Sequence, residues 1–185
     1  MVTPGNDVAE PTRLVFHVND WHTGLIPFLL EVSKGDPIWS QAASVLSIHN
    51  MAYQGDHVGG FLWQLGVPGR NHPSLVYRGL GDNLLAIALA YSDIVSTVSP
   101  RYATEIQYPH MGYGLDGLVR TRLKDLHGIL NGLDVDSWDP ESDPLLVSNY
   151  NAENFVEKRP ANKRQLQLDS GLDARPDVML IGVVS

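Results

Sequence analysis

Two clusters of polar side chains, each directly after an apolar run, could carry out chemistry in this sequence. The first is Asn19-Asp20-Trp21-His22-Thr23, and the second is His49-Asn50, followed closely by Tyr53-Gln54. A carboxylate and an imidazole can move protons or stabilise charge, and amide groups both donate and accept hydrogen bonds. We interpret the two clusters as two walls of one site for a polar ligand of about the size of a sugar.

The elements around these clusters must bring them together. Leu14–Val18 and Ala43–Ile48 are apolar and predict buried strands, and helical spacing of leucine and isoleucine predicts a helix over Thr23–Val32. Strand, polar turn and helix form half of a βαβ unit. Because ligands of open α/β sheets bind at the carboxyl ends of the strands, Asp20 and His49 are expected to face one crevice.

The rest of the chain continues this alternation. The pattern predicts helices over 82–91 and 100–107 and strands over 94–98, 127–130 and 177–184. The fold class expected is α/β, a Rossmann-like parallel sheet with flanking helices. The apolar run Met179–Val184 is typical of a strand covered on both faces, so the chain is expected to be the middle of a larger protein.

Composition excludes several classes of function. The chain has 185 residues, no cysteine and a formal net charge of −8, which excludes disulfides and disfavours binding to nucleic acid. It has no apolar run near the ~20 residues of a membrane helix and no signal segment at Met1, so neither a membrane nor secretion is expected.

Taken alone, the candidate residues leave other interpretations open. His17, Asp20 and His22 could form a metal site, but the geometry of a strand and turn disfavours ligation by all three, and no metal is expected. His49 could be a hydrogen-bonded core histidine, and Asn131-Gly132 is also a common turn signal.

Six motifs in order give the sequence a specific resemblance to bacterial glycogen synthases and plant starch synthases. The motifs are HVNDWHTGLIPFLL, SIHNMAYQG, TVSPRYATEI, YGLDGLVRTRL, GILNGLDVDSWDPESD and KRPANKRQLQ. The resemblance runs from Leu14 to the C-terminus and implies part of a GT-B glycosyltransferase, in which two Rossmann-like domains face each other. It assigns residues 1–13 to a loose lead-in, 14–130 to the second half of the N-terminal domain, and 131–185 to the hinge and the truncated beginning of the C-terminal domain.

The same resemblance implies the roles of individual residues. Asp20 matches a carboxylate that the family needs for activity, and His49 matches the histidine that hydrogen-bonds the donor glucose; we treat these two as the catalytic candidates. Asn131 matches an asparagine of the same glucose pocket. Three further residues are expected to bind substrate: Tyr53, Gln54 and His22.

The function implied is retaining transfer of glucose from ADP-glucose to the non-reducing end of an α-1,4-glucan, without metal or cofactor, in a bacterial cytoplasm or a plastid.

The family's lysine-and-glycine loop and its late glutamate motif are not in this sequence, and relatives often have Lys and Gly where Ala86 and Ala88 stand. The chain alone is therefore expected to be inactive. Two alternatives stay open: a non-catalytic glucan-binding or remnant fragment, and a GT-B transferase for another nucleotide sugar.

Overall fold

The computed structural model describes residues 14–184. The chain divides into two units, Met1–Asn131 and Gly132–Ser185. The expectation that these segments belong to the two domains of a GT-B enzyme stays a prediction.

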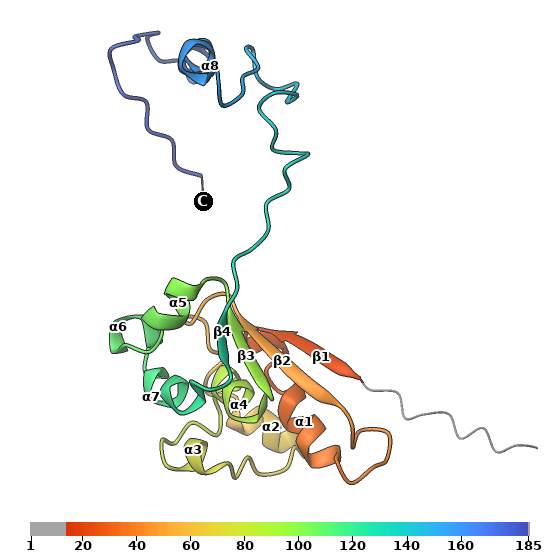
Figure 1. The fold of residues 1–185 in the computed structure, drawn as a ribbon. Coiled ribbons are helices and arrows are strands. Elements are labelled where there is room, and N and C mark those ends of the chain that lie inside the picture. The colour runs from red at the N-terminus through yellow and green to blue at the C-terminus, as the bar shows by residue number, and fades with distance from the viewer. Residues whose placement is uncertain (1–13, 185) are drawn as a thin grey trace, which may run out of the picture. The chain divides into compact units, whose positions relative to one another are not determined.

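The first unit is built on a four-stranded parallel sheet with the strands in sequence order (Figure 1). The strands are β1 (Val15–Asn19), β2 (Ala43–Ile48), β3 (Ile94–Thr97) and β4 (Leu126–Gly128). The first three lie where the apolar runs predict them. The fourth begins one residue earlier and ends two residues earlier than the predicted range 127–130. In the sheet register, Ser47 pairs with Asn19 on one side and Ser96 on the other.

Short helices connect the strands. Their bounds are η1 (Trp21–Thr23), α1 (Ile26–Ser33), α2 (Gly59–Gln64), α3 (Pro73–Val76), α4 (Leu84–Tyr91), α5 (Pro100–Glu105), α6 (Pro109–Gly112), α7 (Asp116–Val119) and η2 (Arg120–Arg122). Helix α4 begins two residues after the predicted start, because the side chain of Asn83 accepts the N–H of Ala86 and caps it.

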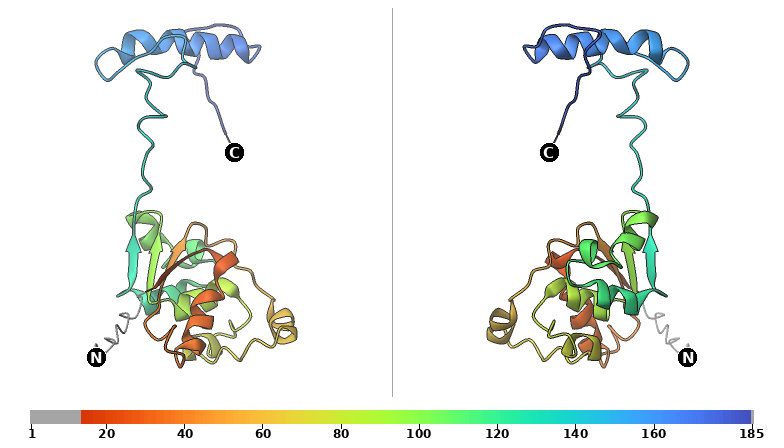
Figure 2. Two further views of the ribbon diagram at one scale, coloured as in Figure 1. Left: turned by 90° about the vertical axis from the view of Figure 1, so that its right-hand side faces the viewer. Right: turned by 90° about the vertical axis from the view of Figure 1, so that its left-hand side faces the viewer.

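The helices cover one face of the sheet (Figure 2). Val18, Leu46 and Val95 point into this side and are buried, and α4 is buried all round between the sheet and its neighbouring helices. The opposite face is open within residues 14–131: Val15 is 67% exposed and Ile94 is 37% exposed. Parallel sheets are usually covered on both faces, so this open face is the unusual surface of the unit.

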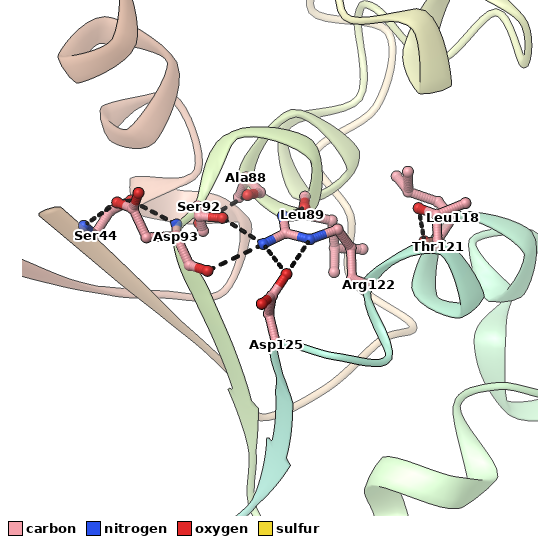
Figure 3. Close-up of polar contacts among 9 residues, drawn as sticks. All are labelled: Ser44, Ala88, Leu89, Ser92, Asp93, Leu118, Thr121, Arg122 and Asp125. Carbon is pink, nitrogen blue, oxygen red and sulfur yellow. Dashed lines mark hydrogen bonds and ion pairs between the residues drawn. The ribbon is translucent and has the colours of Figure 1, made fainter. Parts of the chain in front are cut away.

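Arg122 fastens the end of α4 to the sheet (Figure 3). Its guanidinium donates to three backbone carbonyl oxygens at the end of α4 and the start of β3: those of Leu89, Ser92 and Asp93. The same group forms an ion pair with Asp125, which precedes β4, at 3.2 Å. One cation therefore satisfies carbonyl groups that the end of a helix leaves without partners.

The second unit has one long helix, α8 (Phe155–Asp169), among turns. The predicted strand over 177–184 is wrong for the residues described: Met179 is 81% exposed and Ile181 is 78% exposed, and neither lies in a strand. An apolar run becomes a strand only beside another strand, and the described part of this unit contains none.

Candidate functional site

Asp20 joins the ends of the first two strands. Its φ of 50° and ψ of −160° lie in a region that glycine occupies almost alone, a conformation that costs about 1–3 kcal/mol. The carboxylate Oδ1 accepts the backbone N–H of His49 at 2.8 Å and that of Asn50 at 3.3 Å. The strained turn thus places the carboxylate where it holds the loop after β2.

His49 is also held through its ring. Its Nε2 lies 3.0 Å from Oδ1 of Asn19, the last residue of β1. The two polar clusters predicted from the sequence therefore meet through hydrogen bonds, one to the backbone and one to the imidazole of the same residue.

A hollow of about 320 Å³ lies on the open face of the sheet and reaches the carboxyl ends of its strands. Its lining includes His17, Asn19, His49, His127 and Asn131. Two predicted residues, His49 and Asn131, are therefore brought together in this hollow. The carboxylate of Asp20 holds His49 in place by accepting its backbone N–H. The volume is at the small end of ligand pockets, which suits one sugar unit better than a whole nucleotide sugar.

The floor of the hollow carries a row of polar side chains beside the apolar Val45 and Ile94. Nε2 of His17 is 2.7 Å from the hydroxyl of Ser47, which is itself 2.7 Å from the hydroxyl of Ser96. Among the lining residues, Ser47, Ser96 and His127 are not predicted from the sequence as site residues, and Asn19 is predicted only as part of the first polar cluster. The alternation of side chains in a strand could have found them, because residues two apart share one face.

The metal interpretation finds no geometry in its favour. His17 is engaged with Ser47, Asp20 holds the loop after β2, and the ring of His22 stacks on Trp21 with centroids 4.1 Å apart. Among residues 14–184, no three histidine or carboxylate side chains are grouped to hold a metal ion.

The structure places Gln54 and Tyr53 in different surroundings. The amide nitrogen of Gln54 donates to the carbonyl oxygens of Met51 and Tyr113, and its oxygen accepts from Asn83. Both amide hydrogens are therefore used within the protein. Tyr53 is 66% exposed. Neither Tyr53, Gln54 nor His22 lines the hollow, so their contact with substrate stays a prediction.

Gly55 completes the loop because only glycine fits there. Its φ is +59°, and a Cβ at this position would lie 2.4 Å from the indole ring of Trp21. Trp21 packs against the core from η1, so the close approach locks the loop after β2 onto the turn after β1.

A larger groove of about 1250 Å³ runs along α8 in the second unit. Its lining is mostly apolar, with Phe155, Val156 and Met179 among the residues, and Arg159 and Lys163 at its polar part. It contains none of the residues that the sequence predicts for the site.

Comparison with known proteins assigns the chain to a family. The starch synthase catalytic domain family matches residues 7–121, which is more than half of the chain. The chain belongs to this family. Glycogen synthase 1 of Geobacter sulfurreducens is 44% identical over 175 residues, which cover 92% of this chain and 34% of the relative. The glycogen synthase of Pseudothermotoga lettingae is 40% identical over 174 residues, covering 92% of this chain and 35% of the relative.

A solved structure supports the same assignment. The catalytic domain of starch synthase IV from Arabidopsis thaliana, bound to ADP and acarbose, matches with a TM-score of 0.67 and 32% identity over 86% of this chain and 33% of that one. The predicted fold class, a parallel α/β sheet within the GT-B architecture of starch synthases, is confirmed. The chain spans about a third of the length of the relatives it matches.

A membrane-spanning helix is not found in the part of the chain that the structure describes, where each helix is too short or too polar to cross a bilayer.

Proposed function

We propose that this chain is the part of a starch or glycogen synthase that holds the donor glucose, in an enzyme that transfers glucose from ADP-glucose to the non-reducing end of an α-1,4-glucan with retention. The observation that carries the proposal is the meeting of His49 and Asn131 in one hollow of a chain that belongs to the starch synthase family. The compartment proposed is a bacterial cytoplasm or a plastid.

The residues have distinct roles in this proposal. His49 and Asn131 contact hydroxyl groups of the glucosyl unit, because imidazole and amide groups both serve as hydrogen-bond partners for hydroxyls. Asp20 acts through His49: its carboxylate fixes the backbone of the loop that carries the imidazole. Tyr53, exposed on the same loop, and His22, on η1, are the proposed contacts to the acceptor.

The hollow supplies only part of the chemistry. Departure of a nucleoside diphosphate loads negative charge on the phosphates, and fixed cations must stabilise that charge. Within the described chain, the lining of the hollow combines histidines, serines and amides with apolar side chains such as Ile94 and Leu130, and it contains neither arginine nor lysine. The hollow is therefore suited to the glucosyl end of the donor, and the proposed enzyme supplies the cations from elsewhere.

Two names among the relatives support the choice of substrates. The solved starch synthase IV domain holds ADP together with acarbose, and the bacterial relatives are glycogen synthases. Both fit an adenine nucleotide sugar as donor and a glucan as acceptor.

The experiment replaces the matching segment of the Geobacter sulfurreducens glycogen synthase by residues 14–131 of this chain and measures glucose transfer to glycogen. We expect transfer from ADP-glucose, with a clear preference over UDP-glucose. A chimera that melts cooperatively and binds glycogen without transfer from either donor would overturn the proposal in favour of a glucan-binding fragment. Faster transfer from UDP-glucose would assign the chain to a GT-B transferase with another donor.

A further inference from the structure

His49 is held in one orientation from both of its ends. Asp20 accepts its backbone N–H, and Oδ1 of Asn19 lies 3.0 Å from its ring Nε2. His49 is exposed rather than buried, so packing in the core does not explain why its ring is held by Asn19. The contact with Asn19 has a chemical consequence that the contact with Asp20 does not have, because it involves a nitrogen of the imidazole ring.

Asn19 is itself rigid at the end of β1. Its backbone N–H donates to the hydroxyl of Thr23 at 2.8 Å, and that hydroxyl donates back to the carbonyl oxygen of Asn19 at 2.9 Å. The sheet register pairs Asn19 with Ser47, two residues before His49. The amide of Asn19 is thus presented to the imidazole by a closed turn and a paired strand, not by a mobile loop.

An amide oxygen only accepts hydrogen bonds, so the contact requires a hydrogen on Nε2. In a neutral imidazole with Nε2 protonated, Nδ1 carries the lone pair and accepts a hydrogen bond. Among residues 14–184, no protein group is hydrogen-bonded to Nδ1 of His49, and both His49 and Asn19 line the hollow. Nδ1 is therefore the atom of the ring left for a ligand.

We propose that Asn19 is a positioning residue that selects the Nε2–H tautomer of His49, so that His49 offers Nδ1 as an acceptor to a sugar hydroxyl in the hollow. Selection of the tautomer by Asn19, the first half of the proposal, is a property of the free chain. Acceptance of a sugar hydroxyl by Nδ1, the second half, rests on the proposed function, because it takes the ligand to be a hexose that donates a hydroxyl hydrogen.

The first test is nuclear magnetic resonance of the ¹⁵N-labelled chain without ligand, above the pH at which histidines protonate. We expect the His49 ring to show Nε2 protonated and Nδ1 unprotonated, with an Nε2–H proton slow enough in exchange to be observed directly. Asn19→Ala should abolish the observable proton, and Asn19→Asp, which keeps an oxygen at this place, should retain it.

Ser47→Ala is the matched control, because it removes the partner of His17 and leaves Asn19 in place. It should leave the His49 ring signals unchanged.

A hydrogen on Nδ1 of His49 in the unsubstituted chain would overturn the proposal, since the amide of Asn19 would then be turned with its nitrogen toward the ring. An Nε2–H proton that is equally protected in Asn19→Ala would also overturn it. The measurement on the unsubstituted chain decides the tautomer even where a variant fails to fold.

The second test uses the glycogen synthase chimera. Asn19→Ala should lower kcat/KM on the order of tenfold, as expected for the loss of one neutral hydrogen bond in a sugar pocket. An unchanged kcat/KM together with the predicted tautomer would show that His49 is oriented but does not accept the hydroxyl, which overturns the second half alone. A chimera without activity in any form, with the tautomer as predicted, contradicts the proposed function and leaves the role of Asn19 toward His49 standing.

Discussion

Asp20 is the residue on which both polar clusters depend. Its backbone has a conformation that glycine adopts more easily. In this conformation its carboxylate accepts the backbone N–H groups of His49 and Asn50 from the loop after β2. Strained residues of this kind are commonly found at functional sites, where the surrounding contacts hold them in place. The predicted need for a carboxylate at Asp20 would therefore have a physical origin in the position of His49.

His72 gives a prediction about pH. Burial, and then the positive charge of Arg122, lower the pKa of His72 below its ordinary value of 6.5, and its neutral Nδ1 accepts the N–H of Ser74 at the start of α3. The unfolded chain binds this proton more readily than the folded chain. The contribution of neutral His72 to stability is therefore present above pH 6.5 and is lost as the pH falls from 6.5 through the lowered pKa of the folded chain.

Urea unfolding at pH 7.5 and 5.5 measures this effect. We expect the unsubstituted chain to lose more stability between the two pH values than His72→Asn, in which an uncharged residue caps α3 at both. Equal losses in the two proteins would contradict the assignment to His72.

At the scale of elements, β4 and α5 approach each other more closely than a side chain allows. A Cβ on Gly128 would lie 2.4 Å from Cα of Pro100 and from the carbonyl oxygen of Ser99. Gly128→Ala must therefore separate β4 from the start of α5 and should cost roughly 1–3 kcal/mol of unfolding free energy. Gly132→Ala is the control, because nothing lies within 4 Å of its added carbon. Equal midpoints for both variants in thermal unfolding would contradict this contact.

Arg122 gives the second prediction at this scale. Removing it leaves three backbone carbonyl oxygens, between the last turn of α4 and the start of β3, without their donor, so Arg122→Ala should cost roughly 2–3 kcal/mol. Arg101→Ala, which removes an exposed ion pair with Glu105, should leave the free energy of unfolding almost unchanged. Denaturant unfolding compares the two; similar losses would show that the Arg122 contacts stabilise the fold no more than a surface pair.

The sequence predicts the four strands and the helices α4 and α5 of the first unit closely, gives no prediction for α2 and α3, and predicts the details of the site less well. The strand runs and the Ser99-Pro100 start of α5 lie where local patterns place them, because apolar periodicity and capping are local properties. The contact of Asn19 with His49 could not be predicted in the same way, since an asparagine at a strand end is also an ordinary turn residue. Its role appears only when the sheet register sets β1 beside β2.

At the scale of the whole molecule, the two units differ in how much apolar surface they bury. The first has a continuous core around α4, whereas Leu145, Val156 and Met179 of the second are 88%, 70% and 81% exposed. The predicted strand over 177–184 fails for the same reason, because its apolar side chains have no layer to pack against in their own unit. Pattern alone cannot show whether such a layer exists.

Hydrogen exchange should report this difference directly. We expect the amides of β2, β3 and α4 to be strongly protected and those of residues 155–184 to exchange at the earliest times, because local stability follows buried apolar contacts. Exchange measured by mass spectrometry on the intact chain tests this. Protection of residues 155–184 equal to that of α4 would contradict the account of the second unit.

The most direct test of the central claim is the rate of glucose transfer by the glycogen synthase chimera with His49→Ala. If His49 contacts the donor glucose in the hollow, kcat/KM should fall about 10²-fold, as for the loss of a hydrogen-bonding group directed at a reacting substrate. His110→Ala, which changes an exposed histidine on α6 outside the hollow, should leave it unchanged. A His49→Ala chimera as active as its parent would contradict the claim that this hollow holds the glucose.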